Sequence, residues 1–175
     1  MFKKIGIVVL ILIAGTLVLA AAQPPTFRVE RQVAITATPE KIMGFVADFR
    51  QWEVWSPGEK LDPAMKRTFS GAANGKGAVY EWSGNGDVGS GRMEIAAATP
   101  ASTTIDLLFM SPMESRNTMT FALAPQGASK TVLWSMEGPM SFISKVMCVF
   151  VSMDKMIGKD FEKGLADLKA AAEKA

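Results

Sequence analysis

The sequence contains no histidine and only one cysteine, Cys148. The absence of histidine excludes Ser-His-Asp and Cys-His catalysis, and it removes the most common metal-binding side chain. A single cysteine cannot form a disulfide within the chain or a cysteine-rich zinc site. Cys148 lies in an apolar stretch, which predicts a small buried core residue. We therefore predict no catalytic residue, no metal site and no cofactor.

The sequence also lacks a concentration of charge of one sign. It has 19 lysines and arginines against 17 acidic residues, a net charge of +2, and no run of like charge longer than the pair Lys3-Lys4. Nucleic-acid partners usually require a dense basic patch, so no such partner is expected. Hydrophobic residues make up 49% of the chain, which is enough for a substantial core.

The first 25 residues form a separate segment. Two lysines precede residues 5–22, an apolar stretch in which Thr16 is the one polar side chain, and residues 23–25 end it. A spanning helix needs roughly 17–25 apolar residues, and the lysines would remain cytoplasmic. This predicts a single-pass anchor over residues 1–25, with residues 26–175 as a domain on the extracytoplasmic side. A cleaved signal peptide, favoured by the small residues 20–22, would leave that domain secreted or periplasmic.

The domain begins with a strand and one or two short helices. Apolar side chains of one parity mark a half-buried strand over residues 27–35, interrupted by Arg31. Thr38, Pro39 and Glu40 suit the start of a helix that ends near residue 49. Residues 51–57, which contain two tryptophans, predict a second short helix or turn.

Residues 65–137 then form a series of short strands separated by glycine- and proline-containing turns. The predicted strands cover residues 65–70, 78–83, 91–96, 103–109, 114–123 and 130–137. Such close spacing is typical of antiparallel hairpins, because parallel strands need long crossovers.

Residues 140–174 change to helical periodicity and predict one long amphipathic helix. Gly158 and Gly164 interrupt it, which indicates close-contact points or a slight bend.

Together these elements predict an α+β helix-grip fold. A seven-stranded antiparallel sheet would wrap around the long C-terminal helix, with two short helices after the first strand. Because a curved sheet rarely closes completely around one helix, we expect a cavity between them.

At this level of detail the chain resembles the polyketide cyclase/dehydrase and lipid-transport family, within the START-like (SRPBCC) helix-grip superfamily. The resemblance covers about residues 27–172, and its signatures are residues 37–42, 46–52, 55–57, 77–82, 132–138 and 160–165. It implies an internal pocket for a lipid, sterol or polyketide. Some members are cyclases or dehydratases and others only carry or sense ligands. Aromatic cyclases tend to use arginine, histidine or tyrosine, whereas this chain has no histidine and one tyrosine, Tyr80.

Four tryptophans and the tyrosine are the first candidates for the pocket. Trp52 and Trp55 would either gate a ligand or plug the core. Tyr80, Trp82 and Trp134 have the inward parity of their strands and would contact either a ligand or the long helix.

Four further candidates are three methionines and one arginine. The chain has twelve methionines, and the flexible thioethers of Met136, Met147 and Met153 suit either a permissive apolar pocket or ordinary gap filling. Arg116 has the solvent-facing parity of its strand. If it turned inward, its guanidinium would suit a ligand carboxylate.

The leading prediction is a protein that binds or transports a hydrophobic small molecule in an internal cavity at the cell envelope, and that is not an enzyme. A cyclase or dehydratase is the first alternative and would need polar groups such as Tyr80 or Arg116 in the cavity. An interaction domain with a filled core is the second alternative. A cavity of roughly 300 Å³ or more separates a ligand site from a filled core.

Overall fold

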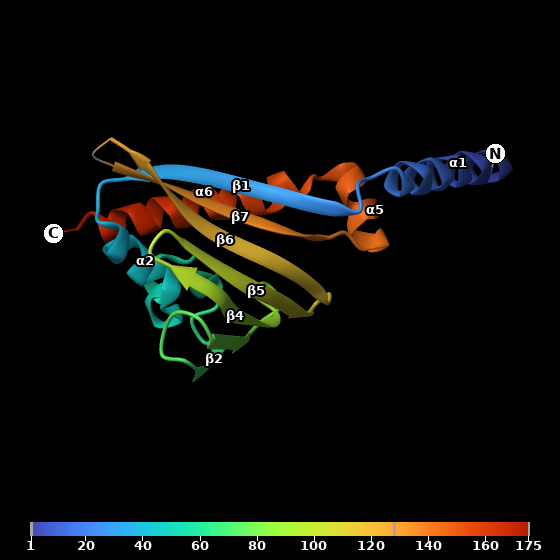
Figure 1. Cartoon of the computed structure of the whole chain (residues 1–175). Helices are drawn as coiled ribbons and strands as arrows, with labels where there is room; N and C mark the ends of the chain where they lie inside the picture. The colour runs from blue at the N-terminus through green and yellow to red at the C-terminus, as the bar shows by residue number, and fades with distance from the viewer. Residues whose placement is uncertain (1, 128, 175) are drawn as a thin grey trace.

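The computed structural model describes residues 2–127 and 129–174, and within them a seven-stranded sheet packs one face against helices (Figure 1). The helices are α1 (Phe2–Ala21), α2 (Pro39–Ala47), the 3₁₀ turn η1 (Phe49–Gln51), α3 (Trp52–Trp55), α4 (Gly58–Leu61), α5 (Phe142–Phe150) and α6 (Met153–Ala172). The strands are β1 (Thr26–Ile35), β2 (Lys66–Gly71), β3 (Ala78–Ser83), β4 (Ser90–Thr99), β5 (Ser102–Ser111), β6 (Ser115–Gln126) and β7 (Ser129–Pro139).

The strand order is β1-β7-β6-β5-β4-β3-β2, and every neighbouring pair is antiparallel. Consecutive strands from β2 to β7 form hairpins, and the last strand, β7, also pairs with the first strand, β1. The α+β helix-grip fold predicted from the sequence is therefore confirmed. β1 and β2 form the two edges of the sheet, so the sheet does not close, and α6 with the short helices occupies its concave side.

Arg31 has a role that the alternation of β1 did not reveal. It lies on the inward parity with Val29 and Val33, where the sequence suggested an exposed strand start. The N-terminal part of α6 crosses β1 at this point. The Arg31 guanidinium forms ion pairs with Asp154 at 2.7 Å and Glu162 at 2.8 Å. An arginine at an inward position thus contacts α6 at the edge of the sheet.

The short helices begin and end where local chemistry requires. Thr38 caps α2 by accepting a hydrogen bond from the backbone N–H of Lys41 at 3.3 Å. Asp48 ends α2 in an extended conformation and caps η1 through the N–H of Arg50 at 2.9 Å. Within residues 51–57, where a second short helix or turn was predicted, the chain forms the one-turn helix α3, with η1 just before it and α4 just after it.

The long helix predicted over residues 140–174 is wrong in one respect, because it is broken into α5 and α6. Val151 has an extended backbone, and Ser152 begins α6 by accepting a hydrogen bond from the N–H of Lys155 at 3.3 Å. Ser152 followed by Asp154 is itself a helix-start pattern that the apolar periodicity concealed. Cys148, predicted to be a core residue, lies on α5 and is only partly buried.

α6 carries the buried stripe. Gly158, Phe161, Leu165, Leu168 and Ala172 follow each other at alternating steps of three and four residues and face the sheet. Gly158 and Gly164 are close-contact points, as predicted: a Cβ on Gly164 would lie 2.7 Å from the Trp134 ring.

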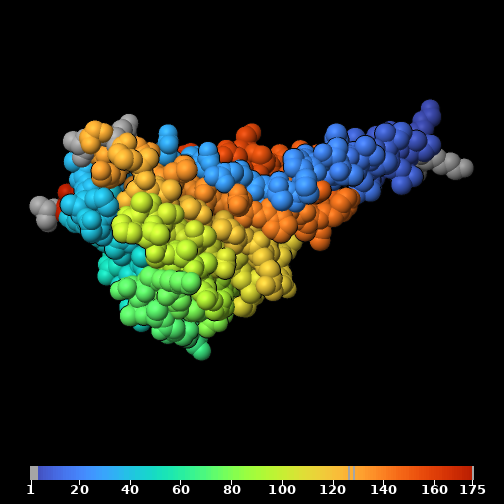
Figure 2. Space-filling view, in the orientation of Figure 1, coloured from blue at the N-terminus to red at the C-terminus, as the bar shows by residue number. Residues whose placement is uncertain are grey.

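α1 projects away from the sheet, and its root lies beside α5 (Figures 1 and 2). Ala20 at that root is fully buried, whereas most of the apolar side chains of α1 are exposed. Among the described residues, Lys4–Ala21 is the one helical stretch long and apolar enough to cross a membrane. Its length and composition fit either a membrane anchor or a signal sequence.

Candidate ligand-binding cavity

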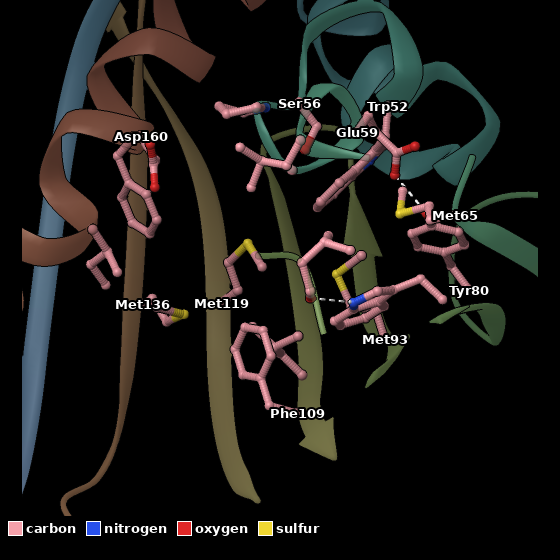
Figure 3. A pocket seen from close by; sticks show the side chains of 18 of the residues that line it. Trp52, Ser56, Glu59, Met65, Tyr80, Met93, Phe109, Met119, Met136 and Asp160 are labelled. Carbon is pink, nitrogen blue, oxygen red and sulfur yellow. Dashed lines mark hydrogen bonds between the residues drawn. The ribbon is translucent and has the colours of Figure 1, made fainter. Parts of the chain in front are cut away.

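A cavity of about 360 Å³ lies between the concave face of the sheet, α6 and the short helices (Figure 3). Side chains from three layers form its wall: α3 and α4 on one side, α6 on the other, and strands β3 to β7 as the floor. A volume of this size falls within the range of sites for small organic molecules.

The floor of the cavity is apolar because the strand register aligns inward-facing side chains into rows. Tyr80 pairs with Met93 and Met93 with Leu107 across β3, β4 and β5. Met119 pairs with Met136 across β6 and β7. Thioethers are flexible and polarizable, so such a floor can adjust to apolar molecules of different shapes.

One end of the cavity is polar. The Tyr80 hydroxyl donates a hydrogen bond to Glu59 Oε1 at 2.6 Å (Figure 3), and Arg67 Nε donates to Glu59 Oε2 at 2.7 Å. Glu59 is buried, and Arg67 also binds the backbone oxygens of Glu59 and Met65. A buried carboxylate requires such a partner, since an unpaired charge would be strongly destabilising.

The cluster favours the protonated forms of Tyr80 and Arg67. Burial, followed by the hydrogen bond to Glu59, raises the pKa of Tyr80 above its ordinary value. The hydrogen bond to Glu59 likewise raises the pKa of Arg67. Tyr80 therefore remains a protonated donor, and Glu59 with Arg67 forms a closed ion pair at the cavity wall.

Sequence reasoning missed Glu59 and Arg67. Glu59 lies in a short turn whose composition resembles any exposed loop, so no local pattern distinguished it. Arg67 did leave a signal, because it shares the parity of Met65 and Phe69 on an apolar strand face. An arginine in such a row predicts a buried partner.

The tryptophans are mainly structural. Trp52 Nε1 donates to the Val46 carbonyl at 3.0 Å, and Trp55 Nε1 donates to the Phe45 carbonyl at 3.1 Å. These carbonyls belong to the last turn of α2, where they have no partner within the helix. Trp52 also lines the cavity, whereas the fully buried Trp55 does not.

Trp134 and Trp82 form parts of the cavity wall. Trp134 stacks on Phe161 of α6 with ring centroids 4.0 Å apart, which fixes the helix on the sheet. Trp82 donates its indole N–H to the Val88 carbonyl at 3.1 Å and so positions the loop between β3 and β4. Both side chains contact core and cavity at once.

A second chamber of about 450 Å³ adjoins the first, with Phe109, Met136 and Ile157 lining both. The turn between β5 and β6, α5 and the start of α6 surround it, and Met147 and Met153 lie in its wall. Asn117 is its buried polar side chain and donates an amide hydrogen bond to Ser115 Oγ at 3.1 Å.

Arg116 lies outside both chambers, and its side chain is 78% exposed with Glu114 as its ion-pair partner at 3.9 Å. Its inclusion among the cavity candidates is therefore corrected, since the strand parity turns it to solvent. Within residues 2–127 and 129–174 no cluster of three or more acidic or cysteine side chains could hold a metal ion.

The fold is shared with proteins of low sequence identity. The di-domain ARO/CYC BexL from the BE-7585A biosynthetic pathway matches with a TM-score of 0.62 and 14% identity over 90% of this chain and 53% of its own. The Aha1 dimer from Colwellia psychrerythraea matches with a TM-score of 0.59 and 16% identity over 84% and 96%. Protein MLL2253 from Mesorhizobium loti matches with a TM-score of 0.57 and 21% identity over 85% and 99%.

Similarity at this level shows the fold alone. No curated protein matches the sequence significantly. The sequence model described as polyketide cyclase / dehydrase and lipid transport matches residues 26–173, which is nearly all of the chain after α1. The chain therefore belongs to the polyketide cyclase/dehydrase and lipid-transport family.

Proposed function

We propose that this protein binds or transports a hydrophobic small molecule, such as a lipid, sterol or polyketide, in its internal cavity. The observation that carries the proposal is the cavity of about 360 Å³ with an apolar floor and one polar end. A ligand bound there would bury apolar surface against aromatic rings and thioethers, which is the main source of affinity for such molecules.

The polar end indicates which polar group a ligand would carry. Glu59 and the Tyr80 oxygen can accept further hydrogen bonds, whereas Arg67 is already occupied by Glu59 and backbone oxygens. A ligand carboxylate would offer only acceptors to the acceptor oxygens of Glu59. We therefore infer a ligand with a hydroxyl or another hydrogen-bond donor at that end.

We further propose that residues 1–25 anchor the domain, residues 26–175, to the outer side of the cytoplasmic membrane. The apolar length of α1 and the lysines that precede its apolar stretch support this arrangement. Cleavage of the segment as a signal sequence would place the same domain free in an extracytoplasmic space. Either arrangement is compatible with a carrier at the cell envelope.

A cyclase or dehydratase is the second candidate, and the Glu59–Tyr80 pair at the cavity wall favours it. Against it, the raised pKa of Tyr80 keeps this hydroxyl protonated, and Arg67 neutralises Glu59. Neither group is arranged as a general base. A filled-core interaction domain is disfavoured by the volume of the cavity. We therefore favour binding without catalysis.

The test is native mass spectrometry of the full chain, released from mild detergent, with solvent extraction of bound material. We expect a stoichiometric apolar adduct in the wild-type protein. Met119→Trp, which places an indole into the cavity, is expected to remove it. Val54→Trp enlarges an exposed residue elsewhere and serves as the matched control.

Thermal unfolding of both variants shows whether Met119→Trp still folds, and Met93→Phe provides a milder second filling. An adduct that remains in Met119→Trp and Met93→Phe at wild-type level would contradict binding in this cavity. Conversion of a polyketide-like substrate that fails with Tyr80→Phe would instead support the enzyme.

A further inference from the structure

α5 is unusual because none of its nine residues is buried, although seven of them are apolar. Ile143, Met147 and Phe150 follow at i, i+4 and i+7, so they share one face of the helix, and Phe142 lies beside them. The side chains of Ile143 and Phe150 are 61% and 73% exposed. Large exposed apolar patches on proteins mark a surface that is covered by a partner or a membrane.

The patch extends beyond α5. Met113 at the turn between β5 and β6 is also exposed. It lines the second chamber together with Met147 of α5. We call Met113, Phe142, Ile143, Met147 and Phe150 the apolar rim.

The position of the apolar rim relative to α1 identifies what covers it. α5 packs against the root of α1, and the backbone N–H of Met140 donates to the Pro25 carbonyl at 2.8 Å. Figures 1 and 2 show α1 leaving the domain at the end where α5 lies. A membrane crossed by α1 would therefore meet this end of the domain first.

The charge of α5 is compatible with that contact. Residues 142–150 contain no acidic side chain, and Lys145 is the one basic residue among them. Without an acidic group, α5 presents no charge that anionic lipid phosphates would repel, and Lys145 can pair with them.

We propose that the apolar rim inserts into the surface of the lipid bilayer that α1 crosses. The mouth of the second chamber then opens onto the bilayer, and the shared wall at Phe109, Met136 and Ile157 connects it to the inner cavity. This proposal rests on the proposed function, in which the cavity binds a hydrophobic ligand. It adds that a hydrophobic ligand passes between bilayer and cavity without crossing water.

The experiment uses the one native cysteine, Cys148 on α5, in the full chain reconstituted into phosphatidylcholine vesicles. A fluorescent maleimide on Cys148 is expected to be quenched by phospholipids that carry a spin label near the headgroup. In a Cys148→Ser background, a label on Met113→Cys should be quenched as well. A label on Ala72→Cys, in the exposed turn between β2 and β3, should not be quenched.

Two variants separate the apolar rim from simple proximity to α1. Ile143→Ser combined with Phe150→Ser should reduce quenching at Cys148 toward the level of Ala72→Cys. Val54→Ser removes another exposed apolar side chain, from helix α3, and should leave quenching unchanged.

Quenching at Cys148 that is equal to that at Ala72→Cys would overturn the proposal. So would quenching that persists unchanged in the double serine variant. Self-quenching between labelled copies without quenching by lipid would assign the face to a second copy of the chain.

Failure of this proposal is distinguishable from failure of the proposed function. A bound adduct in the mass spectrum without lipid quenching would leave a ligand-binding protein whose apolar rim does not touch the bilayer. Lipid quenching without any adduct would leave a membrane-seated domain whose cavity has another use.

Discussion

Glu59 is the charged side chain on which the polar end of the cavity depends. It is a buried carboxylate held by one phenol and one guanidinium, at 2.6 Å and 2.7 Å. Removing one member of a buried pair costs more than the pair contributes, because the remaining charge is left without a partner. The cluster therefore constrains both the stability of the domain and the polarity of the site.

We predict that Glu59→Ala lowers the free energy of unfolding by about 3 kcal/mol, because Arg67 and the Tyr80 hydroxyl both lose their partner. Tyr80→Phe should cost about 1.5 kcal/mol, since Glu59 retains Arg67. Chemical denaturation measures both. Glu94→Ala, which breaks the exposed pair with Arg92, is the control and should change stability by less than about 0.5 kcal/mol. A cost for Glu59→Ala no larger than that of the control would show that the cluster is not a buried pair.

At the level of elements, α6 can lie close to the sheet because Gly164 has no side chain. A Cβ there would lie 2.7 Å from the Trp134 ring and 3.0 Å from the Pro57 ring. Both neighbours are rigid, and Trp134 is itself stacked on Phe161. Gly158 differs, because the nearest atoms belong to the end of the flexible Arg31 side chain.

We predict that Gly164→Ala destabilises the protein by about 1–3 kcal/mol, since overpacking outweighs the gain in helix propensity. Gly158→Ala is the matched variant and should be near neutral. Gly158→Ala gains about 1 kcal/mol of helix propensity. It also perturbs the ion pairs of Arg31 with Asp154 and Glu162, which contribute little to stability because the acidic partners are exposed. Thermal unfolding of the two variants tests this. Equal effects at both positions would contradict the close approach of α6 at Gly164.

The boundary between α5 and α6 is another feature that the apolar periodicity did not reveal. The apolar periodicity of residues 140–174 is the same on both sides of Ser152, and for that reason it predicted one helix. Only the packing shows that Phe161, Leu165 and Leu168 are buried while Phe142 and Phe150 are not. The periodicity is therefore common to a core helix and to a helix that places its apolar face outside the domain.

On the scale of the whole molecule, the sheet remains open between its edge strands β1 and β2. An ion pair joins the short helix α4 to α6. Asp167 of α6 binds Lys60 of α4 at 2.8 Å and Lys163 at 2.9 Å. This contact fastens the short helices over the cavity to the helix on its other side. Lys60, followed by Lys163, holds the pKa of Asp167 below its ordinary value.

Because the pKa of Asp167 is lower in the folded state, its contribution to stability is present above the ordinary aspartate pKa and is lost as pH falls through the lowered value. We predict that Asp167→Asn costs about 0.5 kcal/mol at neutral pH, a small amount because the carboxylate is 30% exposed. The difference from wild type should shrink as pH falls below about 3.8. Unfolding free energies at neutral and acid pH measure it, and a difference independent of pH would exclude the ion pair as its cause.

The architecture follows from patterns in the amino-acid sequence. Alternating strands, turn residues and a final amphipathic stretch define the seven strands and the grip helix, because these patterns depend on local periodicity. The inward parity of Tyr80, Trp82, Trp134 and Met136 followed from the same rule. So did the outward parity of Arg116, which excludes it from the cavity.

The side chains that meet at the polar end of the cavity are set by the tertiary structure. Glu59 and Arg67 meet Tyr80 because a one-turn helix folds over two neighbouring strands, a contact between segments that no local pattern encodes. Arg31 has the inward parity of β1, and α6 supplies the acidic partners that it contacts there. The exposure of α5 likewise depends on which elements pack against it, which is a property of the assembled fold and not of the helix sequence.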